Sequence, residues 1–269
     1  MADKDAVRRH WEADPCGSRG IDEQDRRAFF EQLTRERYEV DAHIPGWARF
    51  SRGRDKDLLE IGVGAGTDFQ QWVEHGARAT GVDLTEAGIA LTKERLALFG
   101  LSGQVRQADA ENLPFSDGSF DVVYSYGVLH HTPDTRRAIG EVHRVLRPGG
   151  TALIMIYRVP SWTGFNLWGL HCLAKGKPWV TPRQAIYDHL ESPGTKAYTD
   201  DEARELMSAF SSVRIDAALL AGDVLTMRAS DRYTNPVHKL IWRVYPTRLV
   251  QTFGKRLGLG LLIEATKQW

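Results

Sequence analysis

Three glycines at alternate positions, Gly62, Gly64 and Gly66, follow a short apolar segment and precede a segment with helical spacing. A strand, a glycine-rich turn and a helix in this order typically form a nucleotide-cofactor site at the carboxyl end of the first strand of a parallel sheet. Glycine suits such a turn because it lacks a Cβ atom and lets the backbone approach a ligand closely. The residues therefore indicate chemistry that depends on a bound cofactor.

The charge beside this turn discriminates between cofactors. A dinucleotide fingerprint would place its third glycine where this sequence has Thr67. Glu60, at the mouth of the turn, would repel a pyrophosphate but would attract the ammonium and sulfonium groups of S-adenosyl-L-methionine. The sequence thus favours that cofactor over NAD or FAD.

Two further acidic residues follow the next two predicted strands. Asp83 lies near the distance from the turn at which a carboxylate accepts hydrogen bonds from ribose hydroxyls. Asp109 follows the third strand and could accept a hydrogen bond from an adenine amino group. Each acid alone could equally be a helix cap or a solvated loop residue. Their position at successive strand ends favours the cofactor interpretation.

The segments EIGVGAG, VDLT, ADAENLPF, FDVVYSYGVLHH and RVLRPGG occur in order within residues 57–157. Together they resemble class I S-adenosylmethionine-dependent methyltransferases, in the small-molecule branch that includes the ubiquinone-type enzymes. The resemblance implies a Rossmann-like, doubly wound seven-stranded α/β sheet whose last strand is antiparallel, and S-adenosyl-L-homocysteine as a product. It also implies a set of cofactor-binding residues: Glu60, Gly62, Gly64, Gly66, Asp83, Leu84, Asp109, Ala110, Tyr126 and Tyr38.

The hydrophobic pattern agrees with such a sheet. Short, continuous apolar runs alternate with helical patterns, as expected for parallel strands buried on both faces. We predict strands at residues 57–61, 79–83, 104–108, 120–125, 151–157, 212–217 and 260–265. We predict helices at residues 6–13, 22–38, 67–75, 85–99, 135–146 and 199–210, with Thr199 and Glu202 forming a capping box. Pro148, Gly149 and Gly150 predict a stop between the preceding helix and the fifth strand.

These elements suggest four regions: an N-terminal helical cap (residues 1–50), the cofactor-binding core (51–158), a substrate-side insertion with its helix (159–211), and the last two strands (212–269). The insertion proper spans residues 160–199. A second, basic insertion spans residues 222–258 and contains an amphipathic segment at 237–256. That segment could lie on a membrane surface, form a homodimer interface or pack against the sheet, and Pro246 interrupts it.

Catalytic candidates follow the fourth strand. His130 and His131 are the best candidates for a general base, because imidazole titrates near neutral pH. The alternative is a structural role in the loop. Tyr157, at the end of the fifth strand, could face the acceptor or pack in the core.

Substrate candidates lie on the polar segment 187–198, where Glu191, Lys196 and Tyr198 could contact the acceptor or belong to a solvated turn. In similar enzymes the N-terminal helices close over the cofactor, so Tyr38 and His43 could contact its carboxylate or the acceptor. For Trp47 we expect packing, and for Cys16 no role in catalysis.

Composition excludes several other classes. The 269 residues contain 35 Lys and Arg against 35 Asp and Glu, so the net charge is zero and a general nucleic-acid binder is not expected. Two cysteines outside any Cys/His cluster predict neither a disulfide framework nor a metal site. The charged first residues predict no signal peptide, and no apolar run is long enough for a membrane-spanning helix. We therefore expect a cytoplasmic protein.

The favoured function is methylation of an oxygen or nitrogen atom in a small-molecule acceptor, a sugar or another secondary metabolite. One alternative is methylation of a lipid or quinone-type precursor at a membrane surface, which the aromatic residues of the first insertion would serve. A second alternative is a non-catalytic protein that binds the cofactor as a partner subunit.

Overall fold

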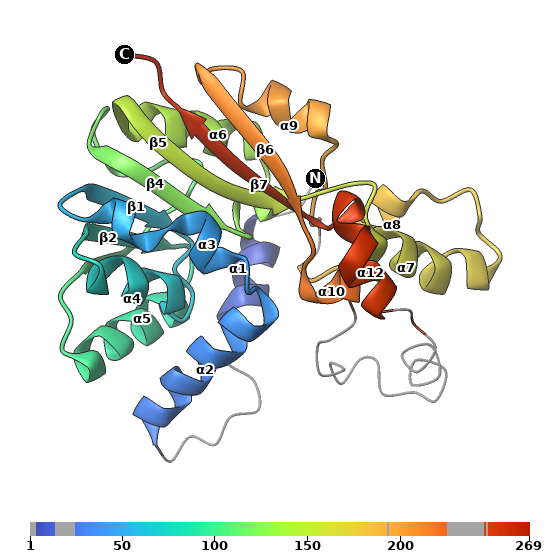
Figure 1. Ribbon diagram of the computed structural model, residues 1–269, viewed down its shortest axis with the longest axis horizontal. Coiled ribbons are helices and arrows are strands. Elements are labelled where there is room, and N and C mark those ends of the chain that lie inside the picture. The colour runs from blue at the N-terminus through green and yellow to red at the C-terminus, as the bar shows by residue number, and fades with distance from the viewer. Residues whose placement is uncertain (1–3, 14–24, 193, 225–244, 246) are drawn as a thin grey trace.

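A seven-stranded mixed sheet forms the centre of the computed structural model, which describes residues 4–13, 25–192, 194–224, 245 and 247–269 (Figure 1). The strand order is β3-β2-β1-β4-β5-β7-β6, and β7 runs antiparallel to the other six strands. The strands are β1 (Asp57–Ile61), β2 (Arg78–Asp83), β3 (Gln104–Gln107), β4 (Phe120–Tyr126), β5 (Leu146–Tyr157), β6 (Ser212–Ala218) and β7 (Gly260–Thr266). The predicted seven-stranded fold is confirmed.

Helices cover both faces of this sheet (Figure 1). Neighbouring residues of β1 point to opposite faces, so Leu58 packs in the layer with α4 and α5, whereas Leu59 packs in the layer with α6 and α9. These helices are α4 (Thr67–Glu74), α5 (Glu86–Phe99), α6 (Thr135–Val145) and α9 (Asp200–Leu206). Both strand faces are therefore buried, as the continuous apolar runs predict.

The N-terminal part forms α1 (Lys4–Ala13), α2 (Arg26–Val40), α3 (Ile44–Ala48) and the 3-10 turn η1 (Phe50–Gly53). Asp25 caps α2, so this helix begins later than the predicted residue 22, of which the structure gives no description. Cys16 also lies outside the described residues. Glu12 accepts hydrogen bonds from the backbone N–H groups of Glu86 and Ala87, which fixes the end of α1 at the beginning of α5.

The helix α6 ends at Val145, close to the predicted end at residue 146. The predicted start of the fifth strand at residue 151 is wrong, because β5 begins at Leu146 and continues through Pro148–Gly150 to Tyr157. The Gly149 N–H donates to the Lys267 carbonyl, and the Lys267 N–H donates to the Gly150 carbonyl. These bonds extend the pairing beyond the end of β7. A register shift between Phe120 and Val122 of β4 accommodates the extra residues.

The first insertion contains two helices that the sequence pattern did not predict, α7 (Trp162–His171) and α8 (Pro182–His189), with η3 (Leu173–Lys175) between them. The predicted capping box of Thr199 and Glu202 is present at α9, which ends earlier than residue 210. Among the described helices, none combines the length and apolar composition that a bilayer crossing requires.

The second insertion is described only in part. It contains α10 (Ala221–Val224), α12 (Thr247–Phe253) and η5 (Gly254–Leu257). Most of the predicted amphipathic segment 237–256 lies outside the described residues. The division of the chain into four regions stays a prediction.

Candidate active site

The glycine-rich turn between β1 and α4 has the backbone conformation that its sequence predicts. Gly62, Gly64 and Gly66 have φ values of 82°, 52° and 75°, in the region that favours glycine. A Cβ atom on Gly62 would lie 2.2 Å from a methyl carbon of Val128, and one on Gly66 would lie 3.0 Å from Thr92. Glycine is therefore required at both positions by conformation and by space.

Asp83, at the end of β2, joins this turn to the next helix. Its Oδ2 accepts a hydrogen bond of 2.9 Å from the Gly64 N–H, and its Oδ1 accepts from the backbone and hydroxyl of Thr85. The Thr85 hydroxyl in turn caps α5. Leu84 is half-buried beside Asp83. The carboxylate is thus held in a fixed orientation at the strand end where ribose was expected.

Asp109 and Ala110 follow β3, and Asp109 is paired with the N-terminal helix. Lys4 Nζ lies 2.6 Å from Asp109 Oδ2 and 2.7 Å from Glu111 Oε2. Although burial opposes the charged form of Lys4, these two carboxylates raise its pKa. Ala110 is buried against the core layer of α6. The helix α1 therefore lies over the strand end where adenine was expected.

Glu60 is a buried carboxyl group at the end of β1, with 3% of its surface exposed. Its Oε2 makes no hydrogen bond to any residue that the structure describes. Burial raises the pKa of Glu60 well above its ordinary value, and the negative charges of Asp68 and Asp83 add to this effect. A cation bound beside Glu60 would compensate both the burial and the repulsion.

Asp68, near the beginning of α4, collects three hydrogen bonds within the site. It accepts from Arg37 Nη2 at 3.0 Å, from the Tyr38 hydroxyl at 2.9 Å and from the Tyr124 hydroxyl at 2.8 Å. The Tyr38 hydroxyl is thus directed to a protein carboxylate. The sequence pattern did not predict the roles of Asp68 and Arg37. In the sequence, the one feature that points to this network is an acidic residue, Asp68, in the first turn of the helix after the glycines.

A second contact between the N-terminal part and the sheet involves Tyr126 at the end of β4. His43 Nε2 lies 2.9 Å from the Tyr126 hydroxyl, and the Arg37 guanidinium lies 4.5 Å from the centre of the Tyr126 ring. Burial lowers the pKa of His43 to about 4, and the charges of Arg37 and Lys255 contribute. Trp47 packs against Tyr126, as expected.

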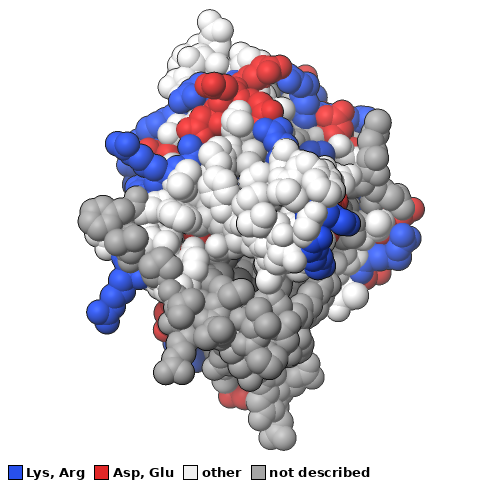
Figure 2. All heavy atoms as spheres, turned by 90° about the vertical axis from the view of Figure 1, so that its right-hand side faces the viewer, with Lys and Arg blue, Asp and Glu red and all other residues white. Residues whose placement is uncertain are grey.

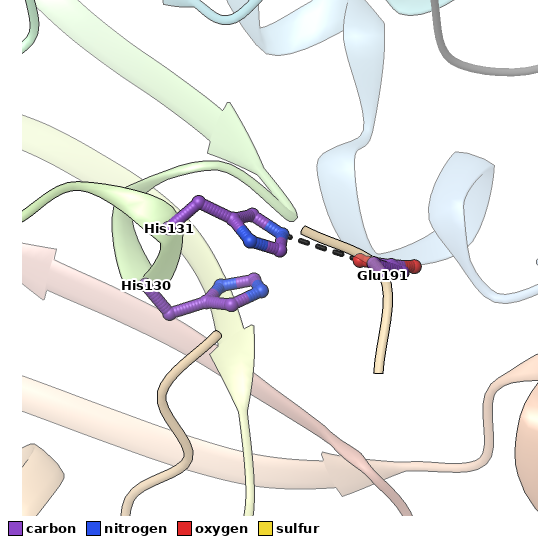
Figure 3. A group of neighbouring side chains, drawn as sticks. All are labelled: His130, His131 and Glu191. Atoms are coloured by element: carbon purple, nitrogen blue, oxygen red, sulfur yellow. Dashed lines mark ion pairs between the residues drawn. The ribbon is translucent and has the colours of Figure 1, made fainter. Parts of the chain in front are cut away.

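The acceptor-side candidates His131, Tyr157 and Glu191 are brought together although they are far apart in the sequence. Figure 3 shows His131 beside Glu191. His131 Nε2 lies 3.2 Å from Glu191 Oε2, and the Tyr157 hydroxyl donates to Glu191 Oε1 at 2.8 Å. Burial alone would raise the pKa of Glu191, but the contacts with His131 and Tyr157 outweigh it and lower this pKa. Glu191 also has a positive φ of 52°, which few residues other than glycine adopt.

His130 packs between these groups. Its ring centre lies 4.0 Å from that of Tyr157 and 4.2 Å from that of His131. The side chain is fully buried, and within the described part of the chain neither ring nitrogen has a hydrogen-bond partner. Burial lowers the pKa of His130 well below its ordinary value, with the charges of His131 and Lys196 adding to the effect. The ring is therefore neutral near pH 7.

The remaining two substrate candidates support this turn. Lys196 Nζ donates to the Thr132 carbonyl, and the Lys196 backbone N–H donates to the His130 carbonyl at 3.1 Å. The Tyr198 backbone pairs with Tyr157 and Val159, and its side chain packs in the layer of α6 and α9. Lys196 and Tyr198 thus hold the histidine turn and the end of β5 in place.

Comparisons with known proteins agree with this geometry. Residues 59–154 match the family described as Methyltransferase domain. The phthiotriol/phenolphthiotriol dimycocerosates methyltransferase of Mycobacterium tuberculosis is 48% identical over 114 residues, which are 40% of this chain and 42% of that protein. The chain therefore matches less than half the length of this relative.

Two other similarities extend further along the chain. The ubiquinone/menaquinone biosynthesis C-methyltransferase UbiE of Idiomarina loihiensis is 27% identical over 190 residues, covering 67% of this chain and 75% of that protein. A chain from the complex between the Haloferax volcanii Trm112 methyltransferase activator and a methyltransferase superposes with a TM-score of 0.62 at 15% identity, over 100% of both chains. At 15% identity, the similarity to the Haloferax volcanii structure is evidence for the fold alone.

The matched segment spans β1 to β5 and contains the glycine turn, Asp83, Asp109 and the two histidines after β4. The strand order and the antiparallel β7 agree with the fold that the motifs imply. Over residues 59–154 the chain is therefore similar to the family described as Methyltransferase domain, and its fold agrees with the resemblance to class I S-adenosylmethionine-dependent methyltransferases.

Proposed function

We propose that this protein transfers the methyl group of S-adenosyl-L-methionine to an oxygen or nitrogen atom of a small-molecule acceptor. One observation carries the proposal: the glycine turn, the buried Glu60 carboxyl group with its unpartnered oxygen, and the carboxylates of Asp83 and Asp109 lie at the ends of three neighbouring strands. The charge of this arrangement suits a cationic methyl donor and disfavours a pyrophosphate.

In this proposal each part of the cofactor meets a group of matching chemistry. The methionine ammonium and the sulfonium would lie near Glu60, Gly62 and Gly64. Arg37, next to Tyr126, would offer a cation to the methionine carboxylate. Asp83 and Leu84 would contact the ribose, and Asp109 and Ala110 the adenine.

The acceptor would then bind beside His130, His131, Tyr157 and Glu191, at the end of the strands next to the methyl group. Holding the acceptor atom in line with the sulfur–methyl bond supplies much of the acceleration of such a displacement. The polar side chains in this region favour an acceptor with hydroxyl groups, a sugar or another secondary metabolite.

Isothermal titration calorimetry tests the cofactor part of the proposal. S-adenosyl-L-methionine and S-adenosyl-L-homocysteine should each bind with one site per chain, and NADH should not bind. Glu60→Gln keeps the size of the side chain and removes its charge, so we expect about tenfold weaker binding of the methyl donor.

Glu205→Gln is the matched control, since Glu205 on α9 is 70% exposed and far from the turn in the fold. Its titration should equal that of the unchanged protein. Tight binding of NADH without binding of either sulfur compound would reject the proposal.

A second candidate is methylation of a lipid or quinone-type acceptor at a membrane surface. The side of the molecule that carries α7 and α8 has a broad uncharged area (Figure 2). Lys and Arg side chains lie around it, and a group of Asp and Glu side chains borders it at the top of this view. Trp179, Leu173 and Phe165 there are 75%, 50% and 40% exposed. A hollow of about 320 Å³ on this side is lined by Phe165, Trp168, Pro178, Trp179, Val180, Thr181 and Pro182.

The charge of this segment suits an anionic bilayer. Residues 161–187 contain no Asp or Glu, and Lys175 and Lys177 are exposed beside the apolar residues. The names of the mycobacterial relative and of UbiE also point to lipid and quinone chemistry in those proteins.

Co-sedimentation with phosphatidylglycerol vesicles distinguishes this candidate from the first. Binding that Trp179→Ser weakens and Trp269→Ser leaves unchanged would favour the lipid acceptor, because both tryptophans are exposed but only Trp179 lies in the apolar area. Absence of binding would leave the polar acceptor as the proposal.

A further inference from the structure

The acceptor side of the site contains two histidines and a carboxylate that converge on one point. His130 and His131 lie in the turn η2 (Leu129–His131) after β4, and Glu191 follows α8. One nitrogen of each ring and one carboxylate oxygen all lie within 4.8 Å of one another. Both imidazole rings extend from the turn toward Glu191 (Figure 3). This set of donors differs from the oxygen donors that Mg²⁺ and Ca²⁺ prefer.

The hydrogen bonds around His131 favour a hydrogen on one of its two nitrogens. The Thr195 hydroxyl donates its only hydrogen to the Ser192 carbonyl at 2.7 Å. At its contact of 3.1 Å with His131 Nδ1 the same hydroxyl oxygen can only accept, whereas the Ser192 hydroxyl, 2.8 Å from this nitrogen, can donate or accept. A hydrogen on Nδ1 suits both contacts, and the proposal below takes this tautomer. The lone pair of a neutral His131 is then on Nε2, which faces Glu191 Oε2 at 3.2 Å.

His131 Nε2 and Glu191 Oε2 would both direct lone pairs at each other across 3.2 Å and would repel each other. A proton on one of them, or a cation between them, removes this repulsion. A second proton on His131 would do so, but it would leave both nitrogens of the buried His130 without partners, at a cost of about 1–3 kcal/mol for such a group. A metal ion would accept electron pairs from His130, from His131 Nε2 and from Glu191 Oε2 together. It therefore provides a partner for His131 Nε2, for Glu191 Oε2 and for one of the two His130 nitrogens; neither His131 Nε2 nor the His130 nitrogens have a hydrogen-bond partner among the described residues.

We propose that His130, His131 and Glu191 bind one divalent transition-metal ion, with Zn²⁺ or Fe²⁺ as the best match to two imidazoles and one carboxylate. In a tetrahedral site, ligand atoms about 2.0–2.1 Å from Zn²⁺ lie about 3.3–3.4 Å apart. The separation of 3.2 Å between His131 Nε2 and Glu191 Oε2 already fits this geometry. The ligand nitrogen of His130, which lies within 4.8 Å of the other two ligand atoms, would have to move closer to them when the ion binds.

The surrounding contacts are those that orient metal ligands. The Tyr157 hydroxyl donates to Glu191 Oε1, which leaves Oε2 for the ion. Ser192 and Thr195 contact Nδ1 of His131 and leave Nε2 for the ion. Hydrogen bonds of this kind fix the ring orientation and the tautomer of histidine ligands.

Three protein ligands leave at least one coordination position open. Resting on the proposed function, we infer that this position takes an oxygen atom of the acceptor, next to the transferable methyl group. His130 and His131 would then be metal ligands. The general base, for which the sequence suggests these two histidines, would be another group. The substrate class is accordingly an acceptor with a hydroxyl or phenol group.

Cobalt titration tests the site without reference to catalysis. Protein without a histidine tag and stripped with a chelator would be titrated with Co²⁺ while its visible spectrum is recorded. We expect one Co²⁺ per chain, with the absorption bands of four- or five-coordinate cobalt, and their loss when Zn²⁺ is added. Glu191→Gln and His130→Ala should each weaken binding at least about tenfold.

His189→Ala is the matched control. His189 stacks on His171 at 4.3 Å, a histidine pair outside the proposed set of ligands. This variant should keep the stoichiometry and the spectrum. Thermal unfolding and S-adenosyl-L-homocysteine binding verify the fold of each variant, and Glu191→Gln, which keeps the side-chain size, decides the test if His130→Ala does not fold.

Two results would overturn the proposal: no saturable uptake of Co²⁺ or Zn²⁺ up to about 100 µM, or uptake that Glu191→Gln and His130→Ala leave unchanged. Absence of saturable uptake would mean that a proton, not a metal ion, joins His131 to Glu191. Uptake that both variants leave unchanged would mean that the ion binds elsewhere in the protein. Binding of S-adenosyl-L-homocysteine to the metal-free protein is measured separately, so failure of the metal site and failure of the methyltransferase proposal are distinguished.

Discussion

Lys4 and Asp109 form an ion pair of 2.6 Å that joins the N-terminal helix to the end of β3. The pair lies where the proposal puts the adenine, so α1 and the cofactor must share this strand end. Both side chains are about one-third exposed, and such pairs contribute at most about 1 kcal/mol. This pair is therefore one weak contact among those that hold α1 over the site, which include the hydrogen bonds of Glu12 with the beginning of α5.

Replacing Lys4 should accelerate the release of the product. In Lys4→Met we expect the dissociation rate of S-adenosyl-L-homocysteine, measured by stopped-flow displacement, to rise by up to about fivefold. Lys93→Met, at an exposed position on α5, is the matched control and should not change this rate. An unchanged rate in Lys4→Met would show that α1 does not cover the bound product.

The glycine turn leads to a second prediction. Gly62→Ala would place a carbon 2.2 Å from Val128 at a φ of 82°, so we expect a loss of stability of about 1–3 kcal/mol and at least tenfold weaker cofactor binding. Gly140→Ala is the control, because nothing lies within 4 Å of its new carbon and its position in α6 favours alanine. Urea unfolding and calorimetry measure both effects. Equal behaviour of the two variants would contradict the geometry of the turn.

Asp68 provides a third prediction. Its removal in Asp68→Ala leaves the hydroxyls of Tyr38 and Tyr124 without their acceptor. It also leaves the Arg37 guanidinium with Asp41 as its one remaining carboxylate partner among the described residues. Loss of one partner from a buried ion pair typically costs about 3–5 kcal/mol, and we expect a decrease of this size in the free energy of unfolding.

Asp117→Asn serves as the control for this measurement. The Asp117 side chain is 80% exposed and pairs with Arg144 at the surface, where such pairs contribute about 0–1 kcal/mol. If Asp68→Ala costs no more than Asp117→Asn, the network around Asp68 does not hold the N-terminal part to the sheet.

The pKa of His43 predicts a dependence of stability on pH. Burial lowers this pKa from 6.5 to about 4, so between these values the unfolded chain binds a proton that the folded protein does not. Stability should therefore fall as the pH decreases from 6.5 to 4, with a contribution from His43 of at most about 1.4 kcal/mol per pH unit. His43→Asn should lack this contribution.

Urea unfolding of the unchanged protein and of His43→Asn, at several pH values between 7 and 4.5, measures the contribution of His43 to the free energy of unfolding. The difference in unfolding free energy between the unchanged protein and His43→Asn should shift in favour of the variant as the pH falls. A difference that stays constant with pH would mean that His43 titrates as freely as in the unfolded chain.

The part of the site that the sequence predicts best is the part encoded by local pattern. Gly62, Asp83 and Asp109 each follow a strand directly, and parallel strands bring their carboxyl ends to one edge. The chain therefore needs only the correct strands to bring these residues together. Their roles toward the cofactor stay predictions until a ligand is bound.

The contacts that the sequence did not predict all join distant segments. Lys4 reaches Asp109 from the N-terminal helix, and no spacing rule connects the two residues. Glu191 is predicted from the sequence as a substrate contact or as part of a solvated turn, and its contacts with His131 and Tyr157 depend on how the insertion that contains α7 and α8 folds. The helix α7 has an apolar, aromatic sequence with two glycines and no clear helical period, so its geometry is decided by packing.

A crystal structure with bound S-adenosyl-L-homocysteine tests the central claim most directly. The account predicts the ammonium group beside Glu60, the ribose hydroxyls on Asp83, the adenine next to Asp109, and the sulfur directed toward His130 and His131. A ligand whose sulfur points away from the two histidines, or one bound outside the ends of β1, β2 and β3, would contradict it.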